Sequence, residues 1–265
     1  MKILFIGDVV GRPGREAVKA VLPELKAETR ADLIIANAEN AHHGKGVTEN
    51  DIKDLKAAGV DFFTSGNHIW KEKSVFPLLD DPKVPLIRPA NYPEGVPGKG
   101  WQIVETASKK KVLVINLLGR LFMNVNLDCP FKAVDKILQE TAEENLNAIF
   151  VDFHAEATSE KIALANFLDG RVSAVLGTHT HVATADWRIL PQGTAFQSDV
   201  GFVGPLDSVI GVEKELIIRH FLTSMPTKHE IAGGPSTFNA TLVDINDQNR
   251  LATKIDFIQR IVGAK

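Results

Sequence analysis

The stretch Thr-Ser-Gly-Asn-His, residues 64–68, decides the interpretation of the rest of the sequence. It follows Val-Asp-Phe-Phe, residues 60–63, which has the apolar character of a short buried strand. Open α/β sheets bind their ligands at the carboxyl ends of their strands. Asn67 can bind a metal ion through its carbonyl oxygen, and His68 can bind a metal ion or transfer a proton. Taken alone, the stretch fits a loop with a helix-capping Asn better than a functional site. Its interpretation therefore depends on the ends of the other strands.

Four further apolar runs, residues 3–6, 33–38, 148–153 and 172–176, end in side chains of the same kind. Strands often finish in polar turn residues, so a single ending of this type carries little information. Five such endings in one chain are more than turn preferences explain. The polar endings are Asp8, Glu39 with Asn40, Asn67 with His68, His154, and His179 with His181.

The order of the apolar segments predicts an α/β fold. Two strand–loop–helix units at the start, with helices that begin near Pro13 and at Thr48, favour a largely parallel sheet. Residues 101–105 and 112–117 are expected to pair antiparallel, residues 77–100 to be irregular, and residues 131–144 and 159–168 to be helical. Residues 188–190, 194–196, 241–245 and 254–258 suggest a second, more antiparallel sheet.

Composition narrows the class of protein. The chain has 265 residues, 44% of them hydrophobic, and a net charge of −3, so it has no basic excess for binding duplex nucleic acid. Cys129 is the only cysteine, which fits a reducing compartment. The first apolar run stops at Asp8, too early for a signal peptide, and no segment approaches the roughly 20 apolar residues of a membrane span. We expect a cytoplasmic protein without a membrane partner, and a homo-oligomer remains an open alternative.

The strand-end residues form a mixed set of oxygen and nitrogen donors. Carboxylates, amide oxygens and imidazoles together suit Mn, Fe, Zn or Ni better than Ca or Mg. The set contains more ligands than one tetrahedral ion uses. A carboxylate such as Glu39 can bridge two ions, and paired ions are typical of enzymes that cleave phosphoesters.

Four motifs carry a resemblance to a known family. They are Gly-Asp-Val-Val-Gly-Arg-Pro-Gly at 7–14, Asn-Ala-Glu-Asn at 37–40, Thr-Ser-Gly-Asn-His at 64–68 and Gly-Thr-His-Thr-His at 177–181. With the lone His154, their order resembles that of the calcineurin-like metallophosphoesterases. Val10 stands where that superfamily has a His, and Ile69 where it has an acid. These departures match the YmdB-type bacterial 2′,3′-cyclic-nucleotide phosphodiesterases, and the resemblance covers essentially the whole chain.

The resemblance implies a single metallophosphoesterase domain over residues 1–265, a sandwich of two mixed β-sheets flanked by helices (α-β-β-α). It implies two divalent or mixed-valence transition metal ions, Fe or Mn with Zn as the alternative. Glu39 would bridge the ions, and a hydroxide between them would attack phosphorus, while His68 would protonate the departing 2′ oxygen as general acid. The ligands would be Asp8, Asn40 and His181 for one ion and Asn67, His154 and His179 for the other.

The remaining assignments concern substrate and alternatives. The expected substrate is a small phosphodiester such as a 2′,3′-cyclic nucleotide, which would leave as a 3′-nucleotide. Arg12 and His43 are candidate substrate contacts, and Asp199 is a candidate support for the loop at 179–181. His220 and His229 are assigned to a helix face and a loop without a role. The alternatives are a phosphomonoesterase acting on a phosphoprotein or small phosphate ester, and a regulatory protein that binds metal and nucleotide without turnover.

Overall fold

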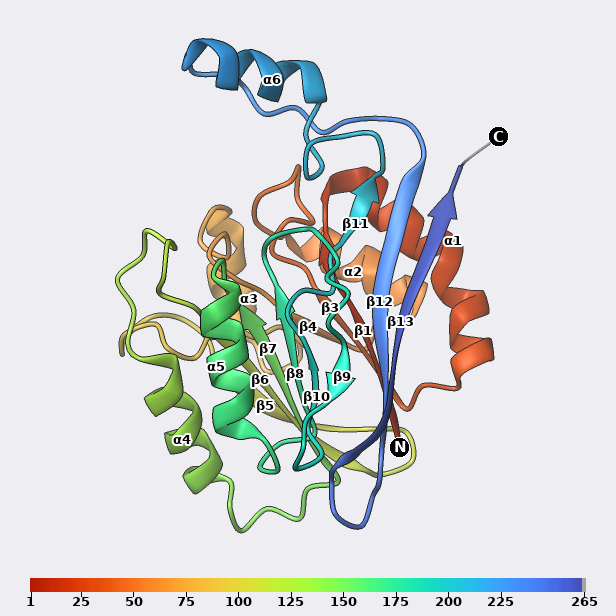
Figure 1. Cartoon of the computed structure of the whole chain (residues 1–265), viewed down its shortest axis with the longest axis vertical. Coiled ribbons are helices and arrows are strands. Elements are labelled where there is room, and N and C mark those ends of the chain that lie inside the picture. Colours follow the sequence, from red (N-terminus) through yellow and green to blue (C-terminus); the bar gives the residue numbers. More distant parts are fainter. Residues whose placement is uncertain (264–265) are drawn as a thin grey trace.

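A computed structural model describes residues 1–263 and contains two β-sheets packed face to face, with helices on their outer faces (Figure 1). The first sheet has the strand order β2-β11-β12-β1-β3-β4, with β13 paired to β12. Its strands are β1 (Lys2–Ile6), β2 (Asp8–Val9), β3 (Leu33–Asn37), β4 (Phe62–Thr64), β11 (Phe202–Pro205), β12 (Ser236–Ile245) and β13 (Ala252–Val262).

The second sheet has the order β5-β6-β7-β8-β10-β9. Both sheets are mixed: β1, β3 and β4 pair parallel, as do β6, β7, β8 and β10, while antiparallel strands flank them. Its strands are β5 (Trp101–Glu105), β6 (Lys111–Leu118), β7 (Ala148–His154), β8 (Ala174–Thr178), β9 (Arg188–Ile189) and β10 (Ala195–Gln197).

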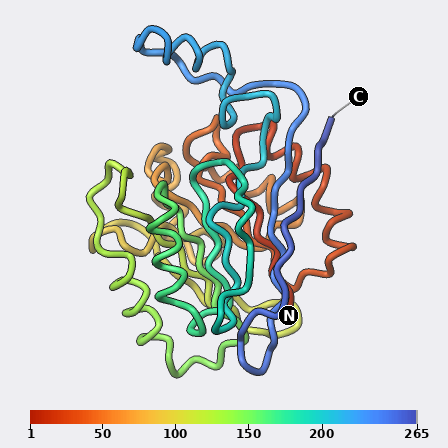
Figure 2. The backbone as a smooth tube through the Cα atoms, viewed as in Figure 1, coloured from red at the N-terminus to blue at the C-terminus, as the bar shows by residue number. Residues whose placement is uncertain are grey.

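The helices lie on the two outer faces, with one exception. Helices α1 and α2 pack on the first sheet and α4 and α5 on the second, whereas α6 stands away from both sheets (Figures 1 and 2). The helices are α1 (Gly11–Thr29), α2 (Glu49–Ala58), α3 (Phe76–Asp80) after a short 3₁₀ turn (Lys73–Val75), α4 (Pro130–Glu140), α5 (Thr158–Leu168) and α6 (Lys214–Thr223). None of the helices within residues 1–263 combines the length and apolar character that crossing a membrane requires.

Successive side chains of the central strands point to opposite faces of each sheet, which explains the four layers. In β1, Leu4 and Ile6 face the helices of the first sheet, whereas Ile3 and Phe5 face the other sheet. Between the sheets the Phe5 ring lies 4.9 Å from that of Phe150 in β7. A strand buried on both faces has an unbroken apolar sequence, which is why these strands were recognisable. The predicted α-β-β-α sandwich is confirmed.

The predicted grouping of the late strands is wrong. Strands β9 and β10 extend the second sheet beside β8, while β12 and β13 join the first sheet beside β1. The start of β12 was not predicted from the sequence because its apolar residues alternate with buried polar residues. The Asn239 amide donates to the Phe202 carbonyl at 3.0 Å, and the Thr241 hydroxyl donates to Gln197 at 2.6 Å. Such pairs cross between distant segments and leave no local pattern.

Two helix boundaries also differ from expectation. The helix predicted over residues 131–144 ends at Glu140, because residues 142–145 are all exposed and further turns would bury no apolar surface. Residues 76–80, partly within the stretch expected to be irregular, form the short helix α3 with Pro77 in its first turn. The helix predicted from Thr48 is confirmed as α2, with a reciprocal capping box between Thr48 and Asp51.

Candidate metal centre

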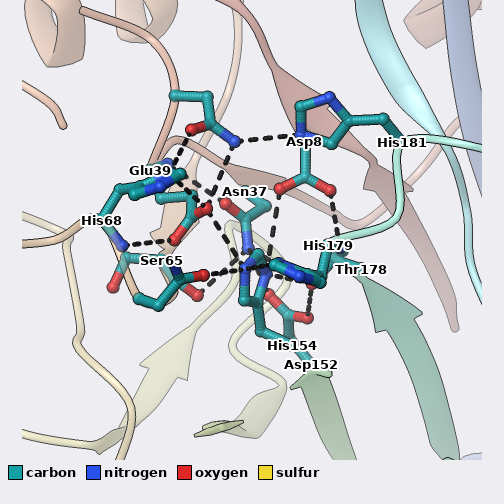
Figure 3. A network of polar contacts seen from close by, with 12 residues as sticks. Asp8, Asn37, Glu39, Ser65, His68, Asp152, His154, Thr178, His179 and His181 are labelled. Atoms are coloured by element: carbon teal, nitrogen blue, oxygen red, sulfur yellow. Dashed lines mark hydrogen bonds and ion pairs between the residues drawn. The ribbon is translucent and has the colours of Figure 1, made fainter. Parts of the chain in front are cut away.

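The strand-end side chains of both sheets converge in one cluster of polar contacts (Figure 3). The carboxyl ends of β3, β4, β7 and β8 meet there because these strands run in the same direction within their sheets. All of the predicted ligands and the predicted general acid are in this cluster. They are Asp8, Glu39, Asn40, Asn67, His68, His154, His179 and His181.

The carboxylate of Glu39 lies between histidines of the two sheets. Its Oε1 lies 3.2 Å from His154 Nε2 and 3.1 Å from His68 Nδ1, and its Oε2 accepts the backbone N–H of His68 at 3.0 Å. Burial raises the pKa of Glu39, but the charges and hydrogen bonds of His154 and His68 lower it more, so the pKa lies well below its usual range. Glu39 is therefore a buried, ionised carboxylate in contact with both sheets.

Gly66 allows this close approach. A Cβ at position 66 would overlap both the Glu39 carboxylate and the imidazole ring of His154. The glycine therefore leaves space that donor side chains fill from two directions. A larger residue would push apart Glu39 and His154, which contact each other across the two sheets.

The tautomer of His154 is fixed by a relay of buried groups. The Thr178 hydroxyl donates to Asp152 Oδ1 at 2.7 Å, so its oxygen accepts from His154 Nδ1 at 2.9 Å. Burial raises the pKa of Asp152 to about 7. Burial lowers the pKa of His154, but Glu39, Asp8 and Asp152 together raise it to about 9. His154 Nε2 faces the cluster, 3.1 Å from Asn67 Oδ1, and releasing its proton frees a lone pair for a metal ion.

His179 faces the cluster through its Nδ1 atom, whereas His154 faces it through Nε2. Its Nε2 lies 3.1 Å from a Glu156 carboxylate oxygen, and its Nδ1 lies 3.1 Å from His154 Nε2. Burial and the neighbouring charge of His154 lower the pKa of His179 to about 3, so the ring is neutral, the form that binds metals. Its backbone φ of 105° lies in the left-handed region that L-residues avoid, which is typical of strain held at functional sites.

Asn40 connects His68 with His181. His68 Nδ1 donates to Asn40 Oδ1 at 2.8 Å, and the Asn40 amide nitrogen lies 3.1 Å from His181 Nε2 and 3.2 Å from Glu39 Oε1. His181 Nδ1 donates to the Ile210 carbonyl at 2.9 Å, which leaves Nε2 as the nitrogen with the lone pair. Half a turn of the amide would bring the Asn40 oxygen between His181 and Glu39, where a ligand belongs, and leave its NH₂ for His68.

Asp8 has one carboxylate oxygen without a hydrogen-bond partner among residues 1–263. The residue is fully buried; Oδ2 accepts the backbone N–H of His179 at 3.1 Å, whereas Oδ1 accepts no hydrogen bond from residues 1–263. Burial raises the pKa of Asp8, and the nearby His181 and His154 offset only part of this effect. An unpartnered buried carboxylate oxygen is costly unless a cation compensates it.

A buried ion pair supports the loop that carries His179 and His181. Lys161 Nζ donates to Asp199 Oδ2 and to the Thr178 carbonyl, both at 2.8 Å, and Asp199 Oδ2 also accepts the Thr180 N–H at 3.0 Å. Both members of the pair are about 1% exposed. The predicted support from Asp199 is confirmed, and Lys161 is its partner.

The donor set fits metal ions. Ligand atoms of Glu39, His154 and His179 lie within 4.8 Å of one another. Around them, Asp8 contributes an oxygen that accepts no hydrogen bond from residues 1–263, and His181 contributes the lone pair of its Nε2. This mixture of carboxylate oxygen and imidazole nitrogen matches the preference of first-row transition metals.

Two predicted substrate contacts lie outside the cluster. Arg12 is exposed, and within the described part of the chain its guanidinium has no hydrogen bond or ion pair with a cluster residue. His43 lines a neighbouring cavity of about 430 Å³ together with His42 and Lys45. Their roles as substrate contacts stay predictions.

Sequence reasoning missed the residues that orient the predicted ligands and two histidines beside the cluster. Asp152, Thr178 and Glu156 orient ligands, while His220 and His229 line a cavity that also contacts Asn40, His68 and His181. Asp152 and Thr178 sit next to or within motifs, but their pairing depends on the register of β7 against β8, where His154 lies opposite Thr178. No local signal marks Glu156, His220 or His229.

Comparisons with known proteins agree with the motifs. A family model described as YmdB-like protein matches residues 4–258. A 2′,3′-cyclic-nucleotide 2′-phosphodiesterase of Bacillus subtilis (strain 168) is 51% identical over 259 residues, which are 97% of this chain and 96% of that protein.

Two crystal structures share the fold over nearly the full chain. A hypothetical protein from Thermus thermophilus is 45% identical with a TM-score of 0.91, covering 98% of this chain and 99% of that one. A novel phosphatase from Mycoplasma pneumoniae is 35% identical with a TM-score of 0.91, covering 98% and 93%. The Glu39–His154–His179 group of this chain is suited to hold a metal ion. The chain therefore belongs to the YmdB-like protein family, as its strand-end motifs predicted.

Proposed function

We propose that this protein is a metal-dependent phosphodiesterase that hydrolyses 2′,3′-cyclic nucleotides to 3′-nucleotides. The observation that carries the proposal is the convergence of Glu39 with ligand side chains from both sheets. The name of the Bacillus subtilis relative supports the substrate class.

We assign the predicted ligands to two ions, Fe or Mn being the expected metals. Glu39 would contact both ions, and its negative charge would offset their repulsion. Asp8, Asn40 and His181 would hold one ion, and Asn67, His154 and His179 the other. When bound, the ions would neutralise phosphate charge and lower the pKa of water, so that hydroxide is available at neutral pH to attack phosphorus.

His68 is the proposed general acid. It is partly exposed, it contacts Asn40, and it lines the cavity beside the cluster, where a leaving group can reach it. Since His68 Nδ1 donates to Asn40 Oδ1, the imidazolium form of His68 would carry its second proton on Nε2. As the bond from phosphorus to the 2′ oxygen breaks, that oxygen would take the proton from Nε2.

We also propose that residues 1–265 form one domain. The apolar core between the sheets contains Ile3, Phe5 and Ile35 of the first sheet together with Val114 and Phe150 of the second. Neither sheet can bury this face without the other, so the two halves should fold as one unit.

The test is turnover by the purified protein loaded with Mn²⁺ or Fe²⁺. We expect hydrolysis of bis(p-nitrophenyl) phosphate and of 2′,3′-cyclic AMP, with 3′-AMP as the chromatographically identified product. Faster turnover of p-nitrophenyl phosphate than of the diester would identify a phosphomonoesterase. Tight metal and nucleotide binding without turnover of any ester would identify a regulatory protein.

A further inference from the structure

The chain makes one large excursion from the sandwich between β11 and β12. Residues 206–235 leave the first sheet there and carry α6, which Figures 1 and 2 show standing clear of both sheets. A short antiparallel neck closes the excursion at its base. Val212 bridges Ile231, the Glu213 N–H donates to the Glu230 carbonyl at 2.9 Å, and the Ala232 N–H donates to the Gly211 carbonyl at 3.0 Å.

Helix α6 leaves large apolar side chains exposed to solvent. Phe221 is 78% and Leu222 80% exposed, and Ile217 is the one residue of the helix that is buried. Ile217 and Phe221 are four positions apart and therefore share one face of the helix. An aromatic ring left in water forgoes the stabilisation that burial would give, so an exposed cluster of this kind marks a binding surface.

That helix face overhangs a cavity of about 400 Å³, which we call the α6 cavity. Ile217 and Phe221 form its wall on the helix side, and Val10 and Ile231 line it from the body of the molecule. The volume lies within the 300–1,000 Å³ that is typical of sites for small organic ligands. The cavity is mainly apolar, as the sites of planar ring systems are.

The α6 cavity is continuous with the metal centre. Asn40, His68 and His181, which belong to the ligand cluster, also line it. The neck is tied to the cluster as well, since His181 donates to the carbonyl of Ile210, another lining residue. A molecule with its phosphate at the cluster would therefore extend its next group into this cavity.

Histidines supply the polar contacts away from the metals. His220 Nδ1 donates to the Met225 carbonyl at 2.8 Å, so its Nε2 is an acceptor when the ring is neutral. Burial, Lys45 and His220 lower the pKa of His229, which is therefore neutral and offers one donor and one acceptor. The neutral ring of His229 can therefore pair with the hydroxyl and amino groups of a nucleoside.

We propose that the α6 cavity binds the nucleoside portion of the substrate, with the base against Phe221 and Ile217 and the phosphate at the metal centre. This inference rests on the proposed function and specifies it, because the cavity would make the enzyme prefer phosphodiesters that carry a base. Part of the exposed face of α6 would then be covered during each turnover.

The test compares Phe221→Ala with Leu222→Ala, since the two residues are adjacent and equally exposed but only Phe221 lines the cavity. For Mn²⁺-loaded protein and 2′,3′-cyclic AMP, we expect Phe221→Ala to raise KM about tenfold or more, the loss of one base–aromatic contact. Its kcat should change little and its metal content not at all. Phe221→Trp should retain the KM of the unaltered protein, and Leu222→Ala should behave like it.

A binding experiment separates this inference from the proposed function. Calorimetry with adenosine 3′-monophosphate requires no turnover and should show weaker binding to Phe221→Ala only. Binding with that pattern but no turnover of any ester would refute the proposed function and retain the cavity assignment. Turnover with equal KM for both alanine variants would refute the assignment. A change of molecular mass by light scattering in both variants would also refute it, by making this face an interface between copies of the chain.

Discussion

The candidate metal centre and the α6 excursion are neighbours with opposite construction. At the centre, Glu39 and His154 are almost completely buried, their ring and carboxylate orientations are fixed by further hydrogen bonds, and their backbone belongs to strand ends of two sheets. In the excursion, Phe221 and Leu222 are exposed on a helix that is joined to the body by a short neck.

This difference separates two tasks. Chemistry on a phosphoester requires charges held in place before the substrate arrives, which buried and hydrogen-bonded strand ends provide. Recognition of the group attached to the phosphate requires an accessible apolar wall, which the excursion provides. Substitutions at the centre should therefore change metal binding or kcat, whereas substitutions in the excursion should change KM.

Glu39→Gln should have the largest effect. A neutral amide cannot offset the repulsion between two cations, so we expect loss of metal and a fall in kcat of about 10³-fold or more. Metal analysis by mass spectrometry and diesterase assays provide the measurements. Glu160→Gln is the control, because Glu160 is also buried but accepts backbone N–H groups of Arg120 and Leu121 outside the cluster. Full metal occupancy in Glu39→Gln would refute its position between two ions.

His68→Ala should separate proton transfer from metal binding. We expect metal content to stay the same while turnover of 2′,3′-cyclic AMP falls by about 10²–10⁴-fold. The loss should be smaller for bis(p-nitrophenyl) phosphate, whose leaving group needs no proton. His42→Ala is the control, since His42 pairs with Asp51 outside the cluster. Equal losses on both substrates, or loss of metal, would mean that His68 binds phosphate or metal instead.

Asn40→Ala should affect one metal site and spare the other. The variant removes the amide between His181 and Glu39, so we expect one ion to be lost from the protein while the second remains. Competitive titration with a chelator measures both affinities. Asn91→Ala, which removes a buried amide that bonds to the Leu118 and Asp128 carbonyls, should keep both ions. Unchanged binding of both ions to Asn40→Ala would refute Asn40 as a metal ligand, and its contact with His68 would be its remaining role.

Thr178→Val should have the smallest effect of the series. It keeps the shape of the side chain but removes the hydroxyl between Asp152 and His154, so we expect metal affinity to fall about 10–100-fold. Thr241→Val is a matched control, because Thr241 is a buried strand residue that bonds to Gln197 away from the ligands. Equal metal affinity of the two variants would contradict the relay.

The sequence was sufficient to place together the residues that lie beside the end of a strand. Asp8, Glu39, Asn67 and His154 each follow or end an apolar run, and parallel strands must bring such endings to one edge. The order of the apolar runs predicted an α/β fold, and the family resemblance implied the sandwich.

What the sequence could not provide depends on contacts between distant segments. The pairing of Asp152 with Thr178 requires the register of two strands, and the sheet that β12 joins is decided by its partner β1. His220 and His229 were assigned no role because their neighbours in the α6 cavity, Val10 and His68, come from the first third of the chain. The general rule that loop excursions carry specificity gave no way to choose these residues.

The most direct test of the account is anomalous diffraction from crystals of the Mn²⁺-loaded protein. We predict two anomalous peaks in the cluster, with the Glu39 carboxylate bound to both ions, His181 to one and His154 to the other. A single peak, or a pair of ions that do not share Glu39, would contradict the dinuclear centre.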